Sequence, residues 1–244
     1  NILNSVGKAC GEAGHETECK KVSKGKTYYG KGNTNQGILQ LLAENNIPLV
    51  IRMVGAVSES GLYKTGTWAA ANAGLIDGLT DYDSNDYGGS VGDNGHMARM
   101  KSAKDVTIEG VGTDAAMDGW GIHFMSETST TAAGLGKNFE VRNLTFMNQP
   151  EDAIGMEGVQ EGSVITAPVE RCWIHNNEFY SPSITGPAES DKAEGDGSCD
   201  FKRGEYLTVS YNYFEGCHKT NLVGSSDTSL QYNLTYHHNI WKGC

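Results

Sequence analysis

The chain has 244 residues, 32 of them glycine, and a formal net charge of −11. This acidic balance, with no basic stripe to offset it, argues against nucleic acid as a partner, and no run of about 18 apolar residues could span a membrane. Abundant glycine with modest hydrophobic content favours many short strands and turns over a helical bundle, and no segment resembles a linker, so we expect one domain over residues 1–244.

The N-terminal part is polar and irregular, with two exceptions. Apolar residues at helical spacing in Gly37–Asn45 predict a short capping helix, and Leu49–Gly55 reads as a buried type of strand that glycine stops. Ser58–His96 lacks sustained periodicity and is expected to be a long excursion. Residues 1–105 would then be cap and excursion. The start at Asn1, without methionine or an apolar leader, is compatible with a processed secreted protein or a trimmed chain.

From about residue 106 to residue 244 a repeat of alternating apolar and polar residues appears. Its segments start at Val106, Phe139, Cys172, Leu207 and Leu234, at intervals of 33, 33, 35 and 27 residues. Unequal intervals favour stacked coils over hairpins of fixed length. The last four segments continue in register to aromatic residues seven positions on, which are Phe146, Phe179, Phe214 and Trp241.

An asparagine recurs in one column of this repeat, at Asn177, Asn212 and Asn239. Stacked amides at a bend would satisfy one another's donors and acceptors from coil to coil. Parallel strands about 4.8 Å apart, one per coil, predict an all-β fold: a right-handed parallel β-helix, or single-stranded solenoid, with a short N-terminal capping helix and long loops that form a cleft on one side. The alternative is a β-sandwich, which would need closer strands and hairpin signals.

The six cysteines lack the paired spacing of a zinc ribbon, so their even number favours disulfides in an oxidising compartment. Cys10 and Cys19 are the nearest local pair. Cys217 and Cys244 each follow a ladder asparagine by five residues and could face each other on adjacent coils. Free buried thiols remain the alternative.

Charged side chains are concentrated between Asp196 and Lys219. Two carboxylates four residues apart, Asp196 and Asp200, precede the cations Lys202 and Arg203, and the stretch ends at Lys219. Hard carboxylate oxygens attract a divalent cation, and lysine or arginine binds an anion. The pattern therefore predicts a metal site beside an anion site.

From Leu49 to Cys244 the chain resembles the secreted pectate lyases of the pectate and pectin lyase superfamily, which are polysaccharide lyases with a parallel β-helix fold. The segments that carry the resemblance are LVIRMVGAV (49–57), VTIEGVG (106–112), FEVRNLTF (139–146), EDAIGMEG (151–158), DGSCDFKRG (196–204), LTVSYNYFEGCHKTNLVGSSD (207–227) and LTYHHNIW (234–241). The resemblance implies an extracellular enzyme that cleaves polygalacturonate, the weakly methylated form of pectin, by Ca²⁺-dependent β-elimination to unsaturated oligogalacturonides.

The resemblance also implies roles for particular residues. The Ca²⁺ ligands would be Asp152, Asp196 and Asp200. A further acid of the family is replaced by Pro150, and Glu151 is a candidate substitute.

Lys219 matches the family lysine that acts on the substrate carboxylate at the scissile bond. Lys202 matches a substrate-binding lysine, and Arg203 is expected to contact a neighbouring uronate or to shield the acids. His218, His237 and His238 correspond to structural positions.

The chain departs from the family pattern in two places. Trp173–Asn176 replaces a Trp-Ile-Asp-His segment, which we expect to repack the floor of the cleft. The catalytic arginine of the family would fall beyond Cys244, which implies a possible second polypeptide that completes the β-helix.

Two other functions are compatible with the same features. One is a non-catalytic β-helix that binds polyuronate, and the other is a hydrolase of the polygalacturonase kind. A hydrolase needs clustered aspartates as acid and base. Lys219 in register with the calcium acids fits a lyase better.

Overall fold

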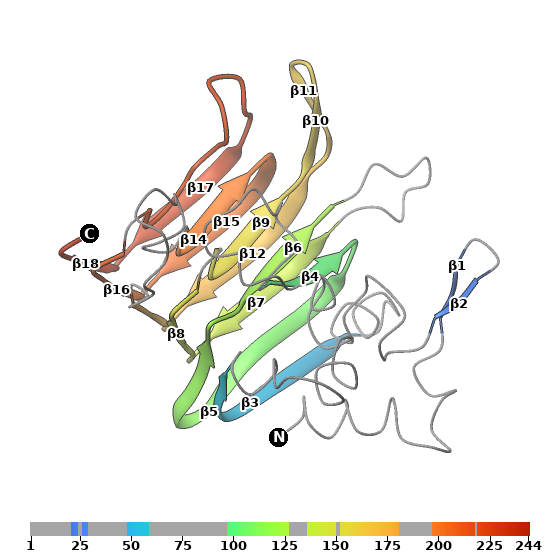
Figure 1. Ribbon diagram of the computed structural model, residues 1–244. Helices are drawn as coiled ribbons and strands as arrows, with labels where there is room; N and C mark the ends of the chain where they lie inside the picture. Colours follow the sequence, from blue (N-terminus) through green and yellow to red (C-terminus); the bar gives the residue numbers. More distant parts are fainter. Residues whose placement is uncertain are drawn as a thin grey trace, which may run out of the picture.

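The computed structural model describes residues 21–23, 26–28, 48–58, 97–126, 136–149, 152–180, 197–217 and 219–244. These ranges contain β-strands that stack side by side, and equivalent strands of successive coils follow one another in chain order, as β5, β7, β12, β15 and β17 do (Figure 1). No helix among them is long and apolar enough to cross a membrane. The helix expected at Gly37–Asn45, the Cys10–Cys19 pair and all of the excursion except Ser58 lie outside the described residues.

The paired strands form two parallel sheets and two antiparallel hairpins. The ten-stranded sheet contains β3 (Leu49–Ser58), β5 (Lys104–Asp118), β7 (Lys137–Arg142), β8 (Thr145–Met147), β12 (Val169–His175), β13 (Glu178–Tyr180), β15 (Gly204–Ser210), β16 (Tyr213–Glu215), β17 (Tyr232–His237) and β18 (Ile240–Lys242). The four-stranded sheet contains β4 (Met97–Lys101), β6 (Gly121–Met125), β9 (Ile154–Glu157) and β14 (Cys199–Lys202). The hairpins are β1 (Lys21–Ser23) with β2 (Lys26–Tyr28), and β10 (Val159–Glu161) with β11 (Val164–Ala167).

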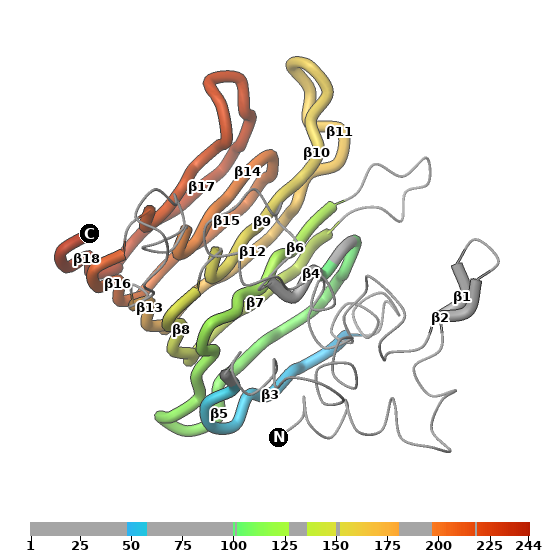
Figure 2. The backbone as a smooth tube through the Cα atoms, viewed as in Figure 1, coloured from blue at the N-terminus to red at the C-terminus, as the bar shows by residue number. Residues whose placement is uncertain are grey.

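The backbone visits both sheets in each turn of its path (Figure 2). One coil consists of β12, β13 and β14 and lies on the coil of β7, β8 and β9. This arrangement is the predicted parallel β-helix. Because β3 pairs with β5 and β4 pairs with β6, the stack includes strands from the region expected to be cap and excursion.

The strand register matches the repeat found in the sequence. Phe139 pairs with Val106 and Cys172, and Leu207 pairs with Cys172 and Leu234. All of these side chains except the partly buried Leu234 belong to the buried core. Burial of the same face in every coil holds the register, because a shift by one residue would turn the apolar side chains to solvent.

The aromatic residues seven positions on also stack as predicted. Ring centroids are 4.9 Å apart for Phe146 and Phe179, 4.7 Å for Phe179 and Phe214, and 5.8 Å for Phe214 and Trp241. The first three rings are almost fully buried. Parallel stacking at one strand spacing follows directly from the in-register pairing of β8, β13, β16 and β18.

The predicted end of the first core strand at Gly55 is wrong. Strand β3 continues to Ser58, and its register against β5 shifts between Val54 and Ala56. Gly55 has a φ of +69°, which glycine adopts without steric cost, so it accommodates a bulge and does not end the strand. The strand is also buried on one face only, since Ile51 is buried and Val50 is half-exposed.

The asparagine ladder is present. The Asn212 side chain donates to the carbonyl oxygen of Ile174 at 2.9 Å and to Oδ1 of Asn239 at 3.1 Å, and its Oδ1 accepts from the backbone and the side chain of Asn177. Asn177 repeats this pattern with Val141 one coil earlier. The ladder thus supplies hydrogen-bond partners for backbone groups at the bend between two strands of each coil. These groups are buried, so they would otherwise lack partners.

Cys217 and Cys244 follow the paired strands β16 and β18 on adjacent coils, as predicted, but the disulfide bond expected between them is not formed. Cys172, Cys199, Cys217 and Cys244 are free thiols, and the first three are buried. Burial, together with the neighbouring Cys244, raises the pKa of Cys217 to about 11. The Cys217 thiol is therefore protonated at neutral pH.

Replacing the central ladder residue should destabilise the fold. Asn212→Ala removes the hydrogen bonds of one buried amide and leaves its partners on two adjacent coils unsatisfied. We expect the free energy of unfolding to fall by about 3 kcal/mol. Urea unfolding followed by circular dichroism measures the loss. Thr235→Ala, at an exposed position of β17, is the control and should change the free energy by less than about 0.5 kcal/mol.

Candidate functional site

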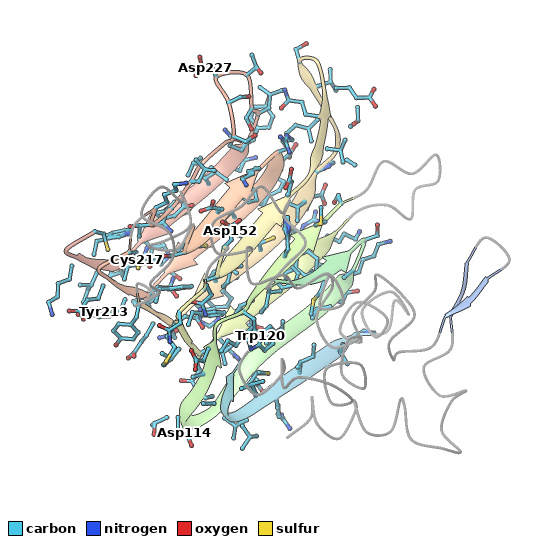
Figure 3. The ribbon with its side chains drawn as sticks, viewed as in Figure 1. Asp114, Trp120, Asp152, Tyr213, Cys217 and Asp227 are labelled. Carbon is cyan, nitrogen blue, oxygen red and sulfur yellow. The ribbon has the colours of Figure 1, made fainter. Side chains whose placement is uncertain are left out.

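The four-stranded sheet positions two buried carboxylates. Asp200 lies on β14 opposite Gly155 of β9, and Asp152 immediately precedes β9 on the preceding coil (Figure 3). Their exposed fractions are 3% for Asp200 and 6% for Asp152. Both accept backbone hydrogen bonds: Oδ1 of Asp152 from the Gly197 amide at 3.1 Å, and Oδ1 of Asp200 from the Leu222 amide at 3.1 Å. The backbone thus fixes one oxygen of each carboxylate.

Gly197 allows the two carboxylates to converge. A Cβ at this position would lie 2.1 Å from Oδ1 and 2.4 Å from Oδ2 of Asp200, and the amide of the same residue binds Asp152. Both carboxylates therefore contact one glycine, and any larger residue there would displace Asp200. Two adjacent buried carboxylates without a side chain between them present the hard oxygen donors that Ca²⁺ prefers.

A cleft of about 520 Å³ opens beside Asp200. Its lining residues are Asp200, Lys202, Lys219, Thr220, Asn221, Leu222 and Ser225. Lys219 comes from the next coil, where its backbone forms a bridge with Gly197 and its carbonyl oxygen accepts from the Ser198 amide at 3.2 Å. The parallel register thus brings Asp200 and Lys202 of one coil and Lys219 of the next coil into one concave site.

The placements of the remaining expected residues differ. Asp196, Glu151 and His218 lie outside the described residues. Within the part of the chain that is described, no three His, Cys, Asp or Glu side chains are grouped closely enough to hold a metal ion. The described part of the expected calcium site is thus the pair Asp152 and Asp200.

Arg203 belongs to an ion cluster at the rim of the cleft. Its guanidinium pairs with Glu157, and its Nη2 donates to Oγ of Ser225 at 2.9 Å. Glu157 lies 3.4 Å from Nε2 of His123, a buried side chain on β6. Burial opposes ionisation of Glu157, but the hydrogen bond with His123 and the charges of His123, Lys202 and Arg203 outweigh it and lower the pKa of Glu157 to about 2.

Glu157, His123 and Ser225 were not predicted as site residues from the sequence. Glu157 pairs in register with Lys202 across β9 and β14, a pairing that a known coil alignment would have predicted. No short motif marks His123. Its role depends on β6 pairing with β9, and β6 lies outside the segments that repeat most clearly.

The expectation that the segment Trp173–Asn176 forms the floor of the cleft is wrong. This segment belongs to β12 and the turn after it, in the ten-stranded sheet, whereas the cleft is lined from β14 and residues 219–225. Trp173 stacks on His175 with ring centroids 3.8 Å apart, and His175 contacts Glu140 at 3.0 Å. The substitution therefore changes a different face of the stack.

Comparison with known proteins agrees with this architecture. A family model described as pectate lyase matches residues 63–244. "Pectate lyase 2" of Pectobacterium carotovorum is 32% identical over 143 residues, which are 57% of this chain and 33% of that protein. "Pectate trisaccharide-lyase" of Bacillus licheniformis is 34% identical over 149 residues, which are 59% of this chain and 37% of that protein. The chain thus spans about a third of the length of these curated relatives.

A solved structure has the same fold. The pectate lyase Bsp165PelA from Bacillus sp. N165, in complex with trigalacturonate, superposes with a TM-score of 0.54 at 24% sequence identity. The superposition covers 84% of this chain and 53% of that one. It confirms the predicted parallel β-helix.

The low pKa of Glu157 predicts a pH-dependent contribution to stability. Its pKa in the folded chain is about 2, below the ordinary value of 4.5, so the folded state favours the ionised form. The stabilisation is fully present above about pH 4.5 and is lost as the pH falls toward 2. Glu157→Gln should therefore unfold at lower urea than the parent chain at pH 5.5, and this difference should shrink as the pH falls to 3. The exposed Glu161→Gln is the control; a difference that stays constant with pH would contradict the prediction.

Proposed function

The chain belongs to the pectate lyase family, and from this membership we propose that it cleaves polygalacturonate by Ca²⁺-dependent β-elimination and releases unsaturated oligogalacturonides. The observation that carries the proposal is the cleft in which Asp200, Lys202 and Lys219 come together beside buried Asp152. The relative solved with trigalacturonate supports a polyuronate as the substrate.

The reaction sets demands that these residues can meet. The enzyme must remove the proton at C5, which is α to the uronate carboxylate, while the oxygen leaves C4 and a C4–C5 double bond forms. An ionised carboxylate makes that proton feebly acidic, so its negative charge must be neutralised in the transition state. Ca²⁺, when bound, would supply this neutralisation as a Lewis acid. Asp152 and Asp200 would hold the ion, with Asp196 as the expected third acid.

The lysines bind and orient the substrate in this proposal. Lys219 pairs with the carboxylate of the uronate at the scissile bond, and Lys202 pairs with a neighbouring uronate. Their placement on two adjacent coils matches a polymer that crosses the strands. The proton acceptor is assigned to no described residue. The arginine expected beyond Cys244 and the second polypeptide piece both stay predictions.

The residues of the cleft support a lyase over a hydrolase. A glycoside hydrolase needs two carboxyl groups that flank the scissile bond. Among the described residues that line the cleft, Asp200 carries the one carboxylate, and two lysines accompany it. The family's usual location supports an extracellular site of action, where polygalacturonate is found.

Loss of Lys219 should abolish most of the activity. We expect Lys219→Ala to lower kcat by about 100-fold or more, because a charge that stabilises the transition state is removed. The absorbance of the unsaturated product, measured with polygalacturonate and Ca²⁺, reports the rate. Lys242→Ala is the control, since Lys242 is exposed and pairs with Glu215. The assay uses the intact protein, including any second polypeptide that completes the β-helix. The proposal fails if this preparation forms no unsaturated product, or if a calcium chelator leaves its rate unchanged.

Gly197→Ala should weaken the binding of Ca²⁺. The added Cβ would overlap the carboxylate of Asp200, so this ligand must move. We expect the calcium affinity, measured by titration calorimetry, to fall by about tenfold or more. Gly162→Ala is the control, because a Cβ at Gly162 meets no atom within 4 Å. Unchanged calcium affinity in Gly197→Ala would show that Asp200 is not a ligand.

A further inference from the structure

One wall of the cleft is formed by a segment without a regular strand. Residues 219–231 connect β16 to β17 and supply five of the seven lining residues. Among the described residues, its only β-pairing consists of two isolated bridges, Gly197 with Lys219 and Phe201 with Val223. The shape of this wall therefore depends on individual hydrogen bonds.

The first half of the segment is fixed by β14. The amide of Phe201 donates to the Leu222 carbonyl oxygen at 2.9 Å, and the amide of Gly224 donates back to the Phe201 carbonyl oxygen at 2.9 Å. The Leu222 amide is also bound by Asp200. Lys219 and Leu222 thus lie on backbone that occupies the place of a fifth strand beside β14.

The second half projects away from the stack, with Asp227 at its tip (Figure 3). The β10–β11 hairpin projects from the same side (Figure 1). Gln160 of this hairpin donates to the Thr228 carbonyl oxygen at 2.7 Å and accepts from the Leu230 amide at 2.8 Å. These bonds hold the end of the loop that is distant from the cleft.

Arg203 holds the end that is next to the cleft. One nitrogen of its guanidinium pairs with Glu157 and another donates to Oγ of Ser225. Ser225 lines the cleft, whereas Arg203 is absent from the lining. Glu157 is in turn held by the buried His123. The chain of contacts therefore runs from the core of β6 through β9 to Ser225.

We propose that Arg203 is a positioning residue, which fixes the wall from Ser225 to Leu230 through Glu157 and Ser225 and thereby sets the affinity of the cleft for a polyuronate chain. The inference rests on the proposed function, because it concerns the same cleft. It replaces the expectation that Arg203 contacts a uronate directly. The guanidinium suits this role because its planar fork can bind a carboxylate and a hydroxyl at once, whereas an ammonium group binds as a single point charge.

The proposal separates substrate binding from turnover. In this proposal Ser225, which lines the cleft, contacts parts of the polymer that do not react. Lys219 and Asp200 are held by hydrogen bonds between β14 and residues 219–222, which do not involve Arg203. Loosening the wall should therefore raise KM and leave kcat within about twofold, since the interactions at the scissile bond remain.

Hydrogen exchange of the amides in residues 224–231 tests the anchoring without reference to activity. The variants are Arg203→Lys, which keeps the charge but loses the fork, and Ser225→Ala, which removes the acceptor. We expect exchange in this segment to become about tenfold faster in both. Arg142→Lys is the matched control, because Arg142 forms a similar ion pair with Glu109, at 2.6 Å, on the other sheet. Unchanged exchange in Arg203→Lys overturns the proposal.

A double-mutant cycle on KM for polygalacturonate distinguishes positioning from direct contact. If Arg203 acts through Ser225, each single variant should raise KM about tenfold and the double variant should raise it no further. If Arg203 contacts the uronate directly, the two effects should multiply, and that result overturns the proposal. A parent chain that binds no polyuronate would contradict the proposed function, while the exchange experiment still decides whether Arg203 holds the wall.

Discussion

The in-register pairing of parallel strands is the constraint on which the rest of this structure depends. Each paired residue of a coil lies beside its counterpart in the preceding coil. A side chain that packs well or forms a hydrogen bond at one position can therefore do the same at the equivalent position of the next coil. The phenylalanine rings of successive coils stack on one another, and the side-chain amide of Asn212 forms hydrogen bonds with the side-chain amides of Asn177 and Asn239. Both columns exist because backbone hydrogen bonds fix the spacing and burial fixes the face.

The same register creates an uneven distribution of charge in the four-stranded sheet. Asp200 lies over Gly155, and Lys202 lies over Glu157, so β14 carries an acid and a cation two residues apart, and the cation is paired in register with an acid of β9. The small residues Gly155 and Gly197 leave room for the carboxylates of Asp152 and Asp200, and both carboxylates contact Gly197. Asp200 and the two lysines line one cleft. In the proposed function this combination suits a divalent ion beside an anionic polymer, because the ion needs carboxylate oxygens and the polymer needs cations.

Features that follow from the alternation of apolar and polar residues within each coil could be predicted from the sequence. Contacts that depend on the pairing of distant segments could not. The columns from Val106 to Leu234 and the asparagine ladder were readable because each coil repeats the same alternation. The end of β3 was misread because a glycine at a bulge resembles a glycine at a stop. Glu157 and His123 were not predicted, since their contacts join β6, β9 and β14 across insertions of unequal length. Asp152, Asp200, Lys202 and Lys219 were recognised by resemblance to a family, and geometry alone would not have assigned their roles.

The unequal coil lengths have a consequence for how such a molecule can change. Successive coils take 33, 35 and 27 residues, yet the strands keep one register. Among the described residues, the β10–β11 hairpin and the loop at 224–231 leave the stack between strands whose register is kept. The scaffold therefore tolerates insertion and exchange at its edges without a penalty in its core. A loop such as Gly224–Gln231 could be replaced to suit another polymer while the acids below it keep their positions. In the proposed function, substrate preference would then depend on the loops and stability on the stacked coils.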